Sequence, residues 1–155
     1  MTQKRFNIRV YGICSIEDKF LITDEIINGF RMTKFVGGGV EWGEGIRDTL
    51  MREFLEECGA EVIETKHFYT TEQFQESAFC SQDQLVSIYY HVKLKDPDLI
   101  SCVQKPFEGL INNQQCFRWV DRALLLCEDF TFPLDRLVVE KIEREKVIKT
   151  GDLGI

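Results

Sequence analysis

The chain has 155 residues, of which 44% are apolar and 29% are charged, and its formal net charge is −7 at pH 7. This length and composition suffice for one hydrophobic core, so a single domain over residues 1–155 is expected. The acidic balance argues against binding to duplex nucleic acid or to an anionic membrane, because both favour lysine and arginine.

Two further properties of the sequence concern the compartment. The N-terminus is not followed by a long apolar run, and no stretch reaches about 18 apolar residues, so neither a secretory signal nor a membrane span is expected. The six cysteines are dispersed without a Cys-x-x-Cys pair, which is typical of reduced thiols. Ordinary packing or surface roles are expected for His67 and His91. We therefore expect a cytoplasmic protein.

The first quarter of the chain predicts extended structure. Residues 6–14 alternate apolar and polar side chains, and residues 19–27 predict a second strand after a short turn. Asn28-Gly29 is a typical hairpin turn signal, and residues 33–36 predict a short extended segment. That segment leads into Gly37-Gly38-Gly39, which we interpret as a flexible loop that lets backbone approach a ligand.

A helix is predicted after this loop, and Gly59 ends it, since glycine adopts the left-handed cap without a Cβ penalty. Further along, Asp96-Pro97-Asp98 interrupts regular structure. The other elements expected are strands at 61–71, 84–95 and 115–120, a short helix at 122–127 and a C-terminal amphipathic helix at 134–149.

Two loops are candidates for contacting a substrate. The loop at 69–84 is long and polar and carries Phe74 and Phe79, which could stack on a base or close a dimer, or could simply anchor the loop. The loop at 105–113 lies between two predicted strands and carries Glu108.

The predicted helix carries an apolar stripe and a row of charges. At about 100° per residue, four apolar side chains with i, i+3, i+4, i+7 spacing share one arc, which predicts a face packed on a core. Three glutamates fall together on nearly the opposite face, beside Arg52. The apolar side chains are Met51, Phe54, Leu55 and Cys58, and the glutamates are Glu53, Glu56 and Glu57.

The row of glutamates is either a solvated acidic face or a cation site, because carboxylates this close repel one another. A cation site is favoured because glycines precede the helix, Glu44 adds a fourth carboxylate, and Arg52 can orient a carboxylate or bind a phosphate. Mg²⁺ takes oxygen ligands, and the lack of His and Cys in the row argues against zinc. Activity on a polyphosphate should then depend absolutely on the divalent cation.

The segment 38–60 resembles the Nudix box, the signature of the Nudix hydrolases. The family pattern is Gly, five residues, Glu, seven residues, Arg-Glu, a bulky aliphatic residue, any residue, Glu-Glu, any residue, Gly and a bulky aliphatic residue. Phe54 and Ala60 depart from its two aliphatic positions, and neither bears the chemistry. The seven fixed positions are all present, namely Gly38, Glu44, Arg52, Glu53, Glu56, Glu57 and Gly59.

The resemblance implies an α/β fold, an α/β/α sandwich around a mixed β-sheet. It also implies Mg²⁺- or Mn²⁺-dependent cleavage of a diphosphate linkage in a small-molecule nucleoside diphosphate derivative. Carried over position by position, it assigns roles to residues of the box. The metal ligands would be Glu53, Glu56, Glu57 and the carbonyl at Gly38 or Gly37, and the catalytic set would be Glu53, Arg52 as the group that orients the glutamates, and Glu44 as an outer partner.

Several points stay open in the sequence. The general base is Glu53 or a loop carboxylate, with Glu108 ahead of Glu76, since some family members place a further glutamate in such a loop. A nucleotide sugar is the favoured substrate, with a damaged nucleoside triphosphate, a dinucleoside polyphosphate and NADH as alternatives. A ligand-binding module without catalysis and a diphosphate isomerase are the alternative functions. A homodimer is the expected assembly.

Overall fold

A seven-stranded sheet and two α-helices form the fold in the computed structural model, which describes the backbone of residues 3–151 and the side chains of residues 3–145. Two short 3₁₀ turns, η1 and η2, lie in the connections. In chain order the elements are β1 (Arg5–Ile16), β2 (Lys19–Ile27), β3 (Phe30–Lys34), β4 (Val36–Gly39), α1 (Ile46–Cys58), β5 (Val62–Thr70), β6 (Asp83–Leu94), η1 (Pro97–Leu99), β7 (Gln114–Asp121), η2 (Cys127–Asp129) and α2 (Pro133–Gly151).

Strand β1 is the centre of the sheet. It runs parallel to β6, from the pair Arg5↔Asp83 to the pair Cys14↔Val92, and antiparallel to β4 and to the start of β2. Strand β5 extends the sheet beside β6, while β3 and β7 flank β2, all three in antiparallel pairs. The sheet is therefore mixed, as predicted.

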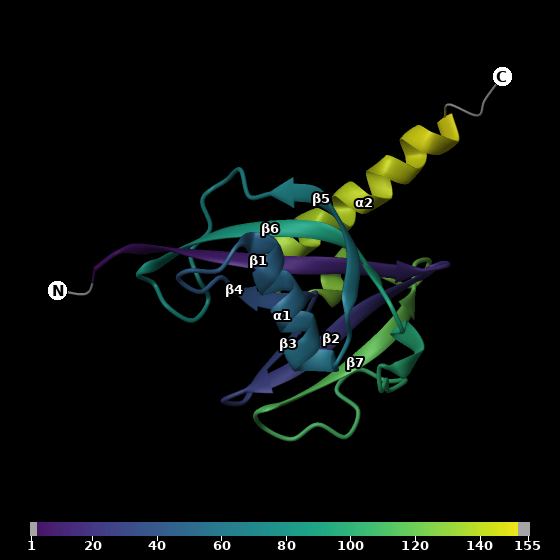
Figure 1. The fold of residues 1–155 in the computed structure, drawn as a ribbon, viewed down its shortest axis with the longest axis horizontal. Helices are drawn as coiled ribbons and strands as arrows, with labels where there is room; N and C mark the ends of the chain where they lie inside the picture. The colour runs from purple at the N-terminus through teal and green to yellow at the C-terminus, as the bar shows by residue number, and fades with distance from the viewer. Residues whose placement is uncertain (1–2, 152–155) are drawn as a thin grey trace.

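The two α-helices cover opposite faces of this sheet, with α1 in front of it and α2 behind it (Figure 1). Successive side chains of β1 point to opposite faces of the sheet. Val10 belongs to the apolar cluster that contains Leu50 and Phe54 of α1, whereas Ile13 belongs to the cluster that contains Val138 of α2. The predicted α/β/α sandwich is confirmed.

The face of α1 that packs on the sheet differs from the predicted one. Leu50 and Phe54 are fully buried, whereas Met51 and Leu55 are 46% and 62% exposed. Phe54 lies against Gly12 of β1, where a Cβ atom would stand 2.4 Å from the phenyl ring. The close approach at Gly12 turns the helix toward Leu50, so the inclusion of Met51 and Leu55 in the packed stripe was wrong.

The three consecutive glycines belong to β4 and not to a flexible loop, which corrects the interpretation from sequence. Gly37, Gly38 and Gly39 pair with Tyr11, Val10 and Arg9 of β1. A Cβ atom at Gly37 would lie 2.0 Å from the Val10 carbonyl oxygen, so glycine is required for this pairing. The segment is thus a rigid strand against which α1 packs.

The region after β7 also differs from the prediction. The helix expected at residues 122–127 is a turn, in which the backbone N–H groups of Leu124 and Leu125 donate to the Asp121 carbonyl. The 3₁₀ turn η2 follows this turn, and at its start the Asp129 carboxylate accepts the backbone N–H of Leu126 at 2.9 Å.

The remaining predicted elements are confirmed, including the C-terminal helix as α2 and the Asn28-Gly29 hairpin turn, where both residues have positive φ. Residues 146–149 of the expected amphipathic helix lie outside the residues whose side chains are described. All six cysteines are free. Within residues 3–151, no helix is both long and apolar enough to cross a membrane.

Candidate active site

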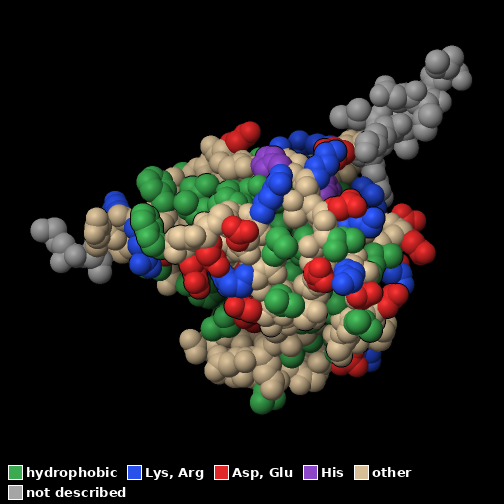
Figure 2. All heavy atoms as spheres, viewed as in Figure 1, with side chains coloured by type: hydrophobic (Ala, Val, Ile, Leu, Met, Phe, Trp, Pro, Cys, Tyr) green, Lys and Arg blue, Asp and Glu red, His purple; other side chains and the backbone are tan. Residues whose placement is uncertain are grey.

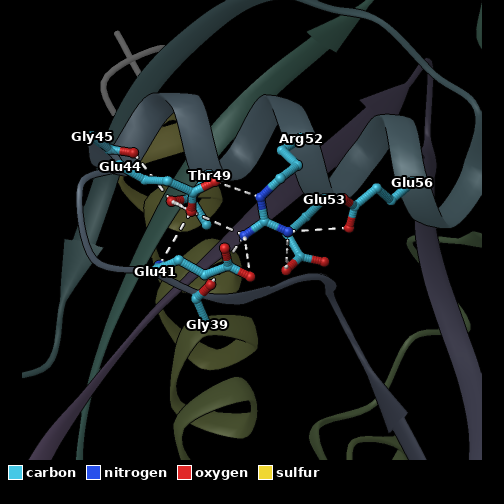
Figure 3. Close-up of polar contacts among 8 residues, drawn as sticks. All are labelled: Gly39, Glu41, Glu44, Gly45, Thr49, Arg52, Glu53 and Glu56. Atoms are coloured by element: carbon cyan, nitrogen blue, oxygen red, sulfur yellow. Dashed lines mark hydrogen bonds and ion pairs between the residues drawn. The ribbon is translucent and has the colours of Figure 1, made fainter.

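Arg52 is the centre of a polar network that joins α1 to the preceding loop and to β4 (Figure 3). Its Nε and Nη2 donate to the two carboxylate oxygens of Glu44 at 2.5 and 3.0 Å, which is a two-point pair. Nη2 also donates to the Gly39 carbonyl at 3.3 Å. Nη1 donates to Glu53 at 3.2 Å and to Glu56 at 3.1 Å. One guanidinium therefore holds the loop, the strand and two of the three glutamates in a fixed relation.

Glu44 anchors this network at the start of α1. One of its carboxylate oxygens accepts the hydroxyl of Thr49 at 2.8 Å and the backbone N–H of Glu41 at 3.2 Å. The hydrogen bonds from Arg52 and Thr49 lower the pKa of Glu44 to about 2. Glu44 is therefore ionised throughout the neutral range, which suits an outer partner that positions Arg52.

Glu53 lies against strand β4 at Gly38. A Cβ atom at Gly38 would stand 2.2 Å from a carboxylate oxygen of Glu53, so only glycine leaves room for this side chain. The Glu53 side chain is 14% exposed, whereas that of Glu56 is 60% exposed. Gly38 thus fixes where the Glu53 carboxylate lies, a role that is independent of any metal bound by its carbonyl.

Glu57 carries a buried oxygen, Oε2, that has no hydrogen-bond partner among the described residues. Burial raises the pKa of Glu57 to about 7, against the opposing charge of Lys34 and with a further upward contribution from Glu53. A buried carboxylate oxygen without a partner is unfavourable unless a cation pairs with it.

The positions of the glutamates differ from the predicted face of α1 in one respect. Glu53 and Glu57 lie next to the packed side of the helix and line a cleft, whereas Glu56 points toward solvent and Arg52. In the space-filling view, acidic side chains gather around a basic one over the region of α1 (Figure 2). The description of all three as a face opposite the core is therefore wrong for Glu53 and Glu57, because the helix is turned toward Leu50.

The donor chemistry of this cluster fits a divalent cation that prefers oxygen ligands, because carboxylates supply only oxygen and one buried oxygen is unpartnered. Within the part of the chain that the structure describes, no three His, Cys, Asp or Glu side chains are arranged to hold a metal ion. Glu53 and Glu56 are instead hydrogen-bonded to Arg52. A bound cation would compete with Arg52 for these two carboxylates, while Glu57 offers a free oxygen.

A cleft of about 490 Å³ opens beside Glu53 and Glu57. Its volume is within the range of small-molecule sites. Charged and apolar side chains both line it, from β1, β2, β3, α1, β6, α2 and the loop before β6. The lining includes Asn7, Arg9, Tyr11, Glu25, Met32, Lys34, Gly37, Gly38, Gly39, Glu76, Phe79, Leu85, Ser87, Tyr89, Phe132 and Asp135.

The loop at 69–84 contributes to the cleft as expected, through residues 75–80. Phe79 contacts Phe30 of β3 edge-on at 5.7 Å between ring centroids, and Phe132 at 6.2 Å. Glu76 also lines the cleft, whereas Phe74 is 69% exposed and does not. This loop therefore forms one wall of the cleft and places a carboxylate in it.

The loop at 105–113 does not line the cleft in the described structure. The Glu108 carboxylate accepts the backbone N–H groups of Gln104 and Lys105 at 2.9 and 3.0 Å, and these bonds lower the pKa of Glu108. Glu108 thus closes its own loop, and of the two loop carboxylates considered from sequence it is Glu76 that reaches the cleft.

The sequence did not single out the titratable residues that β1, β2, β3, β6 and α2 bring to the cleft. Lys34 Nζ lies 3.0 Å from Glu25, and the Tyr89 hydroxyl donates to Asp135 at 2.7 Å. Burial raises the pKa of Asp135 to about 7. The alternation of side chains along β1 could have pointed to Arg9, because it places Arg9 on the same face of the strand as the buried Tyr11.

Comparison with known proteins gives a family match and a set of similar folds. The NUDIX domain matches residues 4–139. No curated protein sequence matches the chain at a significant level.

Three solved structures illustrate the similarity of fold. A MutT structure, from work on Aliivibrio salmonicida and Vibrio cholerae, has 23% identity and a TM-score of 0.63, covering 91% of this chain and 99% of that chain. A NUDIX hydrolase from Nitrosomonas europaea has 22% identity and a TM-score of 0.62, covering 92% and 91%. A mutator MutT protein from Bacillus halodurans has 16% identity and a TM-score of 0.60, covering 86% and 80%.

These structural likenesses support the fold, and the match over residues 4–139 covers most of the chain. Together with the complete box over residues 38–60 and the network around Arg52, the match confirms the resemblance found in the sequence. The chain belongs to the Nudix hydrolase family.

Proposed function

We propose that this Nudix hydrolase cleaves a diphosphate linkage in a small-molecule nucleoside diphosphate derivative, using Mg²⁺ or Mn²⁺. The observation that carries the proposal is the buried, unpartnered oxygen of Glu57, which lies in the same cleft as Glu53. A carboxylate in that state is suited to a cation, and the cleft is acidic enough that a polyphosphate would need one.

Glu53, Glu56 and Glu57 are the proposed metal ligands, with the Gly38 carbonyl as a backbone candidate. When bound, the cation would neutralise charge on the phosphates and polarise the phosphorus–oxygen bonds. Arg52 orients Glu53 and Glu56 through Nη1.

Glu53 is the proposed general base. It accepts a proton from the attacking water, whose oxygen bonds to phosphorus as the bridging oxygen leaves with the other phosphate. Glu76 is the alternative base, because it is the loop carboxylate that lines the cleft.

A nucleotide sugar remains the favoured substrate. The family supports a small nucleotide-containing substrate, and a cleft of about 490 Å³ accommodates a diphosphate and part of its attached groups. A nucleoside triphosphate is the second candidate, because it also carries the diphosphate linkage that the proposed metal site would cleave. Four expectations from the sequence stay predictions: a single domain, a cytoplasmic location, a homodimer, and no binding to nucleic acid or membranes. Light scattering would test the homodimer.

A panel of nucleotide sugars, nucleoside triphosphates, dinucleoside polyphosphates and NADH would test the proposal, with products identified by mass spectrometry. We expect turnover of at least one class with Mg²⁺ and none in EDTA. Glu57→Gln should lower turnover by about 100-fold or more. Glu61→Gln is the matched control, because Glu61 is exposed beyond the end of α1 and pairs only with Lys95.

Two outcomes would contradict the proposed function. Full Mg²⁺-dependent turnover by Glu57→Gln would exclude the proposed metal site. Binding of nucleotides by the wild-type protein without release of any product would instead indicate a ligand-binding module.

A further inference from the structure

Arg9 is a cation of the cleft whose donors are mostly unused. Its Nε donates to the Tyr11 hydroxyl at 2.6 Å, and its guanidinium carbon lies 5.6 Å from the centroid of the Tyr11 ring. The two terminal nitrogens have no hydrogen-bond acceptor among the described residues, and no carboxylate of those residues lies within 4.0 Å of them. Four N–H bonds of the guanidinium are therefore free to bind a ligand.

The other cations near the site are already paired. Lys34 lies 3.0 Å from Glu25, and Arg52 forms its two-point pair with Glu44. Arg9 is half-buried in the cleft, and its terminal nitrogens are not among the buried atoms that lack a partner, so a ligand can reach them. An anionic ligand would bind Arg9 without displacing a partner of those nitrogens, whereas Lys34 and Arg52 would have to give up an existing partner.

Arg9 lines the same cleft as Glu53 and Glu57. Arg9 pairs with Gly39 across β1 and β4, and its Nη1 lies 3.6 Å from the point where a Cβ atom of residue 39 would stand. The adjacent residue, Gly38, faces the other side of β4, where Glu53 packs. The Arg9 guanidinium and the Glu53 carboxylate therefore enter the cleft from the two sides of β4, and the charge of Glu53 acts on Arg9 within it.

We propose that Arg9 binds the diphosphate of the substrate directly, through its two terminal nitrogens. This inference rests on the proposed function, since it names a second point of attachment for the same diphosphate. A planar guanidinium matches two phosphate oxygens at once, which a lysine ammonium does not. Arg9 is thus a substrate-binding residue outside the Nudix box, and it selects for ligands that carry phosphate at this point of the cleft.

The test is calorimetric binding of methylenediphosphonate with Mg²⁺. This probe is a diphosphate that cannot be hydrolysed and has no base, so its binding reports the phosphate contacts alone. Arg9→Gln should weaken binding by about tenfold or more, as expected for loss of hydrogen bonds to a charged group. Arg9→Lys should weaken it about threefold or more, because it keeps the charge and loses the fork.

The matched control is Arg31→Gln. Arg31 lies on β3 with its guanidinium over the Phe107 ring at 4.2 Å, it does not line the cleft, and its replacement changes the net charge by the same amount. We expect wild-type affinity for this variant. Thermal unfolding of each variant shows whether it is folded, and Arg9→Lys carries the test if Arg9→Gln does not fold.

Several results would overturn the inference. They are affinity within twofold of wild type in Arg9→Gln, unchanged affinity in Arg9→Lys, an equal loss in Arg31→Gln, or no binding of the probe by the wild-type protein. The two proposals fail separately. Arg9-dependent binding without turnover of any substrate leaves the inference standing and contradicts the proposed function, whereas turnover with Arg9-independent binding does the reverse.

Discussion

Two arginines border the glutamates of α1, and they differ in how many of their donors the protein uses. Arg52 donates to Glu44, to the Gly39 carbonyl and to two glutamates, whereas Arg9 donates only to the Tyr11 hydroxyl in the described structure. A fully paired guanidinium stiffens its surroundings, and one with free donors can bind a ligand. Arg52 and Arg9 should therefore act on different kinetic parameters, and the predictions below test that difference.

The largest effect is expected from Arg52→Gln. Loss of the guanidinium releases Glu53 and Glu56, so we expect kcat to fall by about 10- to 100-fold with a smaller change in KM. Arg9→Gln should mainly raise KM. Steady-state kinetics on the substrate found in the panel would measure both, and a rise in KM alone for Arg52→Gln would remove the distinction between the two arginines.

A second prediction concerns the strand that lies between the two arginines. Gly38→Ala puts a methyl group where the Glu53 carboxylate lies, so we expect kcat to fall by up to about 100-fold. Gly39→Ala should cost less, because its nearest contact would be 3.6 Å away, at Arg9. Equal losses in the two variants would show that the position of Glu53 does not depend on Gly38.

The packing of α1 provides a third prediction, on stability. Gly12→Ala would place a methyl group 2.4 Å from the Phe54 ring, so the free energy of unfolding should fall by about 1–3 kcal/mol. Denaturant titration would measure the loss. An unchanged free energy of unfolding in Gly12→Ala would contradict the packing effect at Gly12.

The last prediction is a pH dependence of stability due to Asp135, which faces Tyr89, Lys34 and Arg9. Burial raises its pKa to about 7 in the folded state, above an ordinary value of 3.8. Between these pH values the folded state keeps a proton that the unfolded state has lost, so stability falls as pH rises. Asp135→Asn should remove this contribution.

The measurement for Asp135 is the difference in free energy of unfolding between the wild-type protein and Asp135→Asn, from pH 4 to pH 8. We expect the wild-type protein to lose stability relative to the variant up to about pH 7 and to change little above it. A difference that is independent of pH would show that Asp135 titrates normally.

The sequence predicted the position of α1 and its charged residues because the box is local. The spacing of Arg52, Glu53 and Glu56 within α1 determines which side chains can meet, and the mixed sheet followed from the family resemblance. The rotation of α1 was mispredicted because it depends on Gly12 of another strand, which admits Phe54. Periodicity within one helix cannot report a close contact made elsewhere in the chain.

The other residues of the cleft could not be predicted from the sequence for a related reason. Arg9 becomes a neighbour of Gly39 only through the pairing of β1 with β4, and Glu108 is kept from the cleft by bonds within its own loop. Polar residues within a strand show no local sequence pattern that predicts a binding site. Glu76 and Phe79 were within the predicted loop, yet only the fold shows that they form a wall of the cleft.

The loop wall formed by residues 75–80 has a consequence for how substrate preference can change. Its backbone bonds join Gln75 to Leu85 and Ser77 to Asp83, and Phe79 rests on Phe30 and Phe132, so its shape is maintained without the Arg52 network. The loop wall and the glutamates of α1 are therefore held by separate sets of contacts. The loop can then be exchanged between related proteins while the glutamates of α1 keep their positions.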